Sequence, residues 1–161
     1  MGMYRQIAEE EFDYKISPEQ LGLALPIYVA ETDEIARKEA RPHIEAFFNK
    51  FLRMSNEMLM PPGYTSISSL KAIRIAQREL LMGGHTMEKV DELGMFIVGS
   101  ADTVRSRLED FRQRLGLGQL CAILQFGTLP HEQTKKNLEL FASEVMPHFR
   151  ETPADAKAVA S

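Results

Sequence analysis

Two short segments of the sequence combine glycine with hydroxyl, amide or imidazole groups, a composition typical of loops that bind ligands. The first is GSAD, residues 99–102, and the second is QFGTLPH, residues 125–131. In GSAD, the Ser100 hydroxyl and the nearby backbone amides could bind a phosphate or another anion at the start of a helix. The alternative is that Ser100 caps this helix while Gly99 makes a tight turn.

The QFGTLPH segment offers side chains that could face a pocket for a small molecule. Gln125, Thr128 and His131 carry the polar groups, and Gly127 gives the chain a turn between them. Histidine titrates near neutral pH and could therefore transfer protons to or from a substrate. The alternative is that His131 is a solvated residue in the first turn of a surface helix. Both segments are candidates for binding, and no catalytic residue can be assigned.

Several other chemistries have no support in the sequence. No P-loop, G-x-S-x-G or G-x-G-x-x-G motif occurs, and GLGQL at 116–120 precedes an expected strand, whereas a dinucleotide-binding turn follows one. His43, His85 and His148 have no partner at the spacing of a metal site. The single cysteine, Cys121, excludes an internal disulfide, and its apolar setting in LCAILQF predicts a buried structural thiol.

Length and composition indicate one globular domain. The chain has 161 residues, of which 44% are hydrophobic and 26% charged, and its formal net charge is −4. It shows neither a cluster of basic residues for nucleic acid nor an apolar run near the ~20 residues that span a bilayer. The start, MGMYRQIAEEEF, lacks the features of a secretory signal, so we expect a cytoplasmic protein. We expect residues 1–150 to fold and residues 151–161 to form a disordered tail.

The candidate segments follow strands of a predicted parallel sheet. Three apolar runs have the length and composition of strands: LALPIYVA (23–30), MFIVG (95–99) and QLCAILQF (119–126). A helical pattern follows each of them, and parallel strands need such crossover connections. The sequence therefore predicts the α/β class. In this class ligands gather at the carboxyl ends of the strands, where GSAD and QFGTLPH lie.

Apolar residues at steps of three and four predict the helices. Thr32 is expected to cap the helix after the first strand, and Pro42 is expected to bend it. We expect helices at residues 3–12, 31–54, 69–82, 86–94, 101–115 and 131–150, with an irregular loop at 55–69. The inward face of the last helix is predicted to carry Leu138, Phe141, Val145 and Phe149.

Between residues 4 and 150 the sequence resembles the C-terminal part of the bacterial luciferase-like flavin-dependent monooxygenases. The segments that carry the resemblance are PIYVAETDEIARKEA, PPGYTS, FIVGSADTVRSRL and LQFGTLPHEQTKKNLELFASEVMPHFR. The last segment is the most specific of the four. The resemblance implies a TIM-type (β/α)₈ barrel that uses reduced flavin mononucleotide (FMN), or the deazaflavin F420 in some branches, to oxidise a small organic substrate with dioxygen.

A (β/α)₈ barrel needs about 250 residues, so three βα units would form only its C-terminal part. We therefore expect a partial barrel that contributes Gly99 and Ser100 to a flavin site and the QFGTLPH rim to a substrate pocket. Its open sheet edges predict self-association or pairing with a complementary barrel half. The alternative is a non-catalytic α/β module that acts as an assembly or regulatory subunit, and the sequence alone leaves enzymatic activity of this chain undecided.

Overall fold

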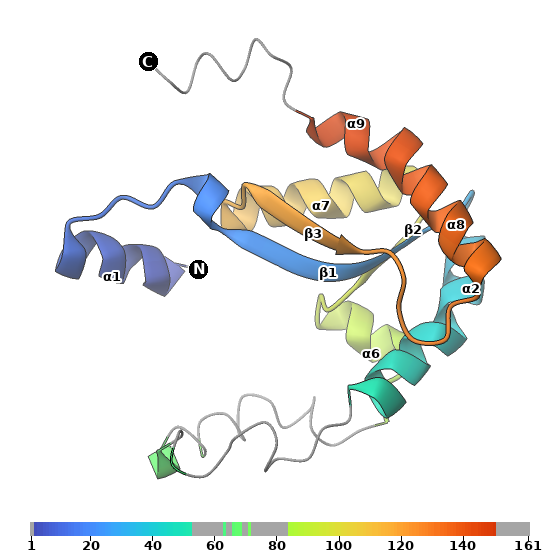
Figure 1. The fold of residues 1–161 in the computed structure, drawn as a ribbon, viewed down its shortest axis with the longest axis horizontal. Helices are drawn as coiled ribbons and strands as arrows, with labels where there is room; N and C mark the ends of the chain where they lie inside the picture. Colours follow the sequence, from blue (N-terminus) through green and yellow to red (C-terminus); the bar gives the residue numbers. More distant parts are fainter. Residues whose placement is uncertain (1, 53–62, 64–65, 69–70, 72–83, 151–161) are drawn as a thin grey trace.

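The computed structural model describes residues 2–52, 63, 66–68, 71 and 84–150, and Figure 1 shows their arrangement. Almost all of the expected loop at 55–69 and of the expected helix at 69–82 lies outside the described residues. The expected tail at 151–161 lies outside them entirely.

Three parallel strands form one sheet in the described part of the chain, which confirms the predicted α/β class. They are β1 (Gly22–Val29), β2 (Ile97–Gly99) and β3 (Gln119–Ile123). The C-terminal half of β1 pairs with β2, with Ile27 opposite Ile97. Its N-terminal half pairs with β3, with Gly22 opposite Gln119. The strand β1 therefore holds the sheet together.

The strands follow the order β2-β1-β3 across the sheet. Three successive units of a closed (β/α)₈ barrel would instead appear in chain order, with the second strand in the middle. Here the connections β1 to β2 and β2 to β3 run in opposite directions across the sheet. Because such crossovers are right-handed, they place helices on both faces.

The core accordingly has two halves, one on each face of the sheet. On one face, Tyr28 and Val98 pack with the helices α2 (Asp33–Ala46) and α6 (Met87–Glu92). On the other face, Ile27, Val29 and Ile97 pack with α7 (Ala101–Leu115) and the π-helical segment η3 (Phe141–Val145). Burial on both faces explains why the strands read as continuous apolar runs.

The remaining elements surround this core (Figure 1). They are α1 (Gly2–Phe12), the short 3₁₀-helix η1 (Pro18–Gln20), the π-helical segment η2 (Phe47–Phe51), α8 (His131–Leu140) and α9 (Met146–Phe149). The expected cap of α2 is confirmed, because the Thr32 hydroxyl accepts a hydrogen bond from the Ile35 amide at 3.2 Å. Pro42 lies inside α2, as expected.

Two predictions about burial are wrong. Cys121 is exposed, because the first residues of β3 pack mainly against β1 and η1 and no long helix in the described part of the chain covers them. In the last helix, Phe141 and Val145 are buried as predicted, but Leu138 is 47% exposed and Asn137 is fully buried. The buried face of this helix begins at Asn137, because the Asn137 side-chain amide forms hydrogen bonds with backbone groups of Ile27, Val29 and Leu124.

Candidate functional site

The carboxyl ends of all three strands lie at one end of the sheet, because the strands are parallel. After β1 the chain enters α2 on one face, and after β2 it enters α7 on the opposite face. The segments that leave the neighbouring strands β1 and β2 therefore run to opposite faces of the sheet. In open α/β sheets the point between two such strands forms a crevice in which ligands commonly bind.

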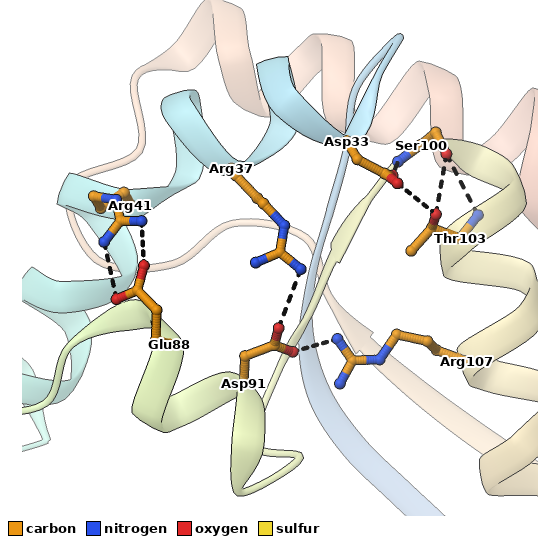
Figure 2. A network of polar contacts seen from close by, with 8 residues as sticks. All are labelled: Asp33, Arg37, Arg41, Glu88, Asp91, Ser100, Thr103 and Arg107. Carbon is orange, nitrogen blue, oxygen red and sulfur yellow. Dashed lines mark hydrogen bonds and ion pairs between the residues drawn. The ribbon is translucent and has the colours of Figure 1, made fainter.

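The carboxylate of Asp33 lies at this point and is directed toward the start of α7 (Figure 2). The Ser100 amide donates to Asp33 Oδ1 at 2.6 Å, and the Thr103 hydroxyl donates to Asp33 Oδ2 at 2.9 Å. These hydrogen bonds, above all the one from the Ser100 amide, lower the pKa of the Asp33 carboxyl. A side chain of the protein therefore occupies the position at the start of α7 where an external anion was expected.

Ser100 caps α7, as its position in the sequence predicted. Its hydroxyl accepts a hydrogen bond from the Thr103 amide at 3.4 Å. Gly99 is needed because of close packing: a Cβ atom there would lie 2.7 Å from both Asp33 Oδ1 and Thr103 Cγ2. Both residues of the proposed flavin site thus have structural roles in the folded chain.

Replacing Asp33 with asparagine is expected to destabilise the protein in a pH-dependent way. The folded-state pKa of Asp33 is lowered, so its contribution is present above the unfolded pKa of about 3.9 and is lost as the pH falls through the folded value. The stability difference between wild type and Asp33→Asn should be constant above about pH 5 and shrink below about pH 4. Urea denaturation at several pH values measures it.

The matched control is Ser100→Ala, which removes the capping hydroxyl but keeps the backbone amide that Asp33 binds. It is expected to cost about 1 kcal/mol with a smaller pH dependence than Asp33→Asn, because the Ser100 hydroxyl contributes less to the lowered pKa of Asp33 than the Ser100 amide does. A difference between wild type and Asp33→Asn that stays the same down to the lowest pH would show that the Asp33 charge does not stabilise the start of α7.

Ion pairs near this crevice join α2 to α6 and α7 (Figure 2). Asp91 binds both Arg37, at 3.3 Å, and Arg107. Arg41 binds Glu88, and this hydrogen bond lowers the pKa of Glu88 to about 2. The exposed pair of Arg41 with Glu88 stabilises the fold only weakly, whereas the pair of Asp91 with Arg107 is partly buried.

A second feature at the same end of the sheet is a cleft of about 560 Å³ between α2 and α8. Behind it, the hydroxyl of the buried Tyr28 donates to Glu39 Oε2 at 2.8 Å. Burial raises the pKa of Tyr28, and the hydrogen bond to Glu39 raises it further. Across the cleft, Lys136 forms an ion pair with Glu31 at 2.9 Å, and this contact lowers the pKa of Glu31. We call this feature the α2–α8 cleft.

The structure brings two of the four predicted pocket residues against α2. Thr128 Oγ1 shares a hydrogen bond with Nδ1 of His43, a cleft residue, at 2.8 Å. Gly127 lies so close that a Cβ atom would be 2.3 Å from the backbone oxygen of His43. Gln125 and His131 are exposed and do not line the cleft.

The buried amide of Asn137 is a structural centre that the sequence analysis missed. Asn137 Oδ1 accepts a hydrogen bond from the Val29 amide at 2.8 Å. Its Nδ2 donates to the carbonyls of Ile27 and Leu124, each at 2.9 Å. This side chain therefore ties α8 to the carboxyl end of β1 and to the loop after β3. Its burial could have been predicted from the sequence, because Asn137 lies four residues before the apolar Phe141 and therefore on the same face of the helix.

The cleft residues Glu31, Glu39 and Lys136, and Tyr28 behind the cleft, were also missed. Tyr28 lies in an apolar strand, and the charged residues lie on or beside helices, where a solvated role is the common one. Among the residues that the structure describes, no group of three or more His, Cys, Asp or Glu side chains could hold a metal ion. No helix in the described ranges is long and apolar enough to cross a membrane.

Neither a protein-family model nor a curated protein matches the chain. Solved structures are similar to it, among them two monooxygenases. One is the monooxygenase RslO1 from Streptomyces bottropensis, with a TM-score of 0.58, 20% identity and 92% of this chain covered. The other is the oxygenating constituent of 3,6-diketocamphane monooxygenase from Pseudomonas putida, a type II Baeyer-Villiger enzyme in complex with FMN, with a TM-score of 0.61, 18% identity and 94% coverage.

The chain spans 36% of the length of the first of these proteins and 39% of the second. At such low identity the similarity concerns the fold. The described α/β unit thus shares its fold with part of two monooxygenases.

Proposed function

We propose that this chain forms the C-terminal part of a luciferase-like flavin-dependent monooxygenase, which oxidises a small organic substrate with reduced flavin and dioxygen. The observation that carries the proposal is the shared fold with two monooxygenases, one of them an FMN complex. The sequence resemblance between residues 4 and 150, strongest at QFGTLPH and the helix after it, supports the same function. We propose FMN as the cofactor, with F420 as the alternative, and the cytoplasm as the location.

In the proposed enzyme further structure completes a (β/α)₈ barrel, and the strand order β2-β1-β3 of the described unit then has to change to the chain order of a barrel on assembly. The edge strand β3 supports this, because Leu120 is 41% exposed and Cys121 is exposed along it. Such an uncharged, apolar edge readily pairs with another strand. The partner is a second copy of this chain or a complementary barrel half.

The residues of GSAD do not fit the phosphate of a flavin in the arrangement described. The Ser100 amide already donates to Asp33, and the carboxylate of Asp33 would repel a phosphate. We therefore assign no step of the reaction to Gly99 and Ser100, which remain at most neighbours of the flavin. Gln125, Gly127, Thr128 and His131 remain the proposed rim of the substrate pocket.

Titration with flavin under anaerobic conditions tests the proposal. Binding of oxidised FMN is followed by its fluorescence, and binding of reduced FMN is followed by difference absorbance. The enzyme function predicts that reduced FMN binds with a Kd of about 1 µM or below, and parallel titrations with oxidised FMN and F420 identify the preferred cofactor. An absence of binding to any of the three at saturating protein would contradict the enzyme function.

A non-catalytic α/β module, acting as an assembly or regulatory subunit, is the second candidate. The observation that favours it is the position of Asp33, whose carboxylate lies at the point where a ligand would otherwise bind. This function predicts no flavin binding together with a stable assembly. Size-exclusion chromatography with light scattering measures the assembly, and a monomer that also fails to bind flavin would contradict both candidates.

A further inference from the structure

The α2–α8 cleft contains polar groups that lack partners in the folded protein. Gln133, on α8, lines the cleft, and its Oε1 atom is buried without a hydrogen-bond partner among the described residues. A buried acceptor without a donor costs about 1–3 kcal/mol. Because Gln133 lines the cleft, a turn of its side-chain amide toward the cleft would let Oε1 accept from a ligand that supplies an N–H or O–H group.

Two charged groups of α2 line the same cleft. Glu39 accepts the Tyr28 hydrogen bond through Oε2, which leaves Oε1 as an acceptor. Lys38 forms no ion pair within the described ranges, whereas Lys136, across the cleft, is already paired with Glu31. The cleft therefore presents two acceptors and one unpaired ammonium group.

The formal charges of the cleft cancel. Lys38 and Lys136 contribute two positive charges, and Glu31 and Glu39 contribute two negative charges. A ligand with a net charge would therefore gain little from the field of the cleft as a whole, whereas a ligand with both charges could pair each with its opposite.

We propose that the α2–α8 cleft binds a small zwitterion of the amino-acid class. The ligand's ammonium group donates to Gln133 Oε1 and Glu39 Oε1, and its carboxylate accepts from the Lys38 ammonium. This arrangement satisfies the buried acceptor and leaves the Glu31–Lys136 and Tyr28–Glu39 contacts in place. It does not depend on flavin chemistry and holds for either function proposed above.

Amide chemical-shift titrations of the full chain with glycine test the proposal, in the absence of flavin. Glycine is expected to shift the amides of residues 38–43 and 131–136. Acetate and methylammonium, each with one of the two charges, are expected to bind at least about tenfold more weakly, because each makes only part of the charged contacts. Equal binding of acetate and glycine, or no shift in the cleft at the highest soluble glycine concentration, would overturn the proposal.

Three variants assign the binding to the named groups. Lys38→Ala and Gln133→Leu are each expected to weaken glycine binding about tenfold. Lys135→Ala, which removes an exposed lysine of α8 that does not line the cleft, should bind glycine like the wild type. The side chains of Lys38 and Gln133 form no ion pair or hydrogen bond within the described residues, so both variants should fold. Their amide spectra in the absence of glycine will show this. Unchanged glycine binding by Lys38→Ala and Gln133→Leu would overturn the proposal.

Discussion

Replacing Asn137 with leucine is expected to destabilise the protein by about 3–5 kcal/mol. Leucine has nearly the same shape as asparagine, so the volume at this fully buried position is kept. The variant leaves the Val29 amide and the carbonyls of Ile27 and Leu124 without their Asn137 partner. Each buried group left without a partner costs about 1–3 kcal/mol. Urea denaturation followed by circular dichroism measures the change as a lower midpoint.

The matched control is Leu138→Ala, at the neighbouring position of α8. Leu138 is 47% exposed, so this truncation is expected to cost less than about 1 kcal/mol. If Asn137→Leu were as stable as the wild type, the amide of Asn137 would not hold α8 against the sheet, and the description of the carboxyl end of β1 would be wrong.

Replacing Gly127 with alanine is expected to destabilise the protein by about 2–4 kcal/mol. Gly127 has a φ of +57°, and an added Cβ atom would lie 2.3 Å from the backbone oxygen of His43. The loop after β3 would have to move away from α2, because a backbone atom inside a helix cannot yield. The hydrogen bond between Thr128 and His43 should break as the loop moves.

Gly84→Ala separates the two causes of this effect. Gly84 has a similar φ of +70°, but a Cβ atom there would have no neighbour within 4 Å among the residues that the structure describes. It is therefore expected to show only the backbone strain, about 1 kcal/mol. Denaturation curves of both variants give the comparison. Equal losses of stability would show that Gly127 is needed for its backbone conformation alone and not for its approach to α2.

Features that depend on neighbours in the sequence were predicted correctly. The apolar runs became the parallel strands, and Thr32 and Ser100 cap the helices that follow them. These signals are local, because a cap needs only a hydroxyl three residues before the amide that it binds. For the same reason the sequence placed the candidate segments at the carboxyl ends of strands.

Features that depend on strand order could not be predicted in this way. Cys121 was expected to be buried, but within the described ranges no long helix covers the first residues of its strand. Asp33 binds Ser100 across 67 positions of the chain, and Asn137 binds Val29 across 108. A local sequence pattern cannot predict such contacts, because they form only when β1 lies between β2 and β3 in the folded sheet. The α2–α8 cleft depends on the same order, because it forms where β1 and β3 are neighbours.

The central claim is that this α/β unit serves a flavin enzyme through the carboxyl end of its sheet. Amide chemical-shift mapping with reduced FMN under anaerobic conditions tests it most directly. We predict shifts in the loop after β3, at residues 125–131. Shifts confined to the opposite end of the sheet, at Ser17–Gln20 and Gly116–Gly118, or no shifts at all, would contradict it.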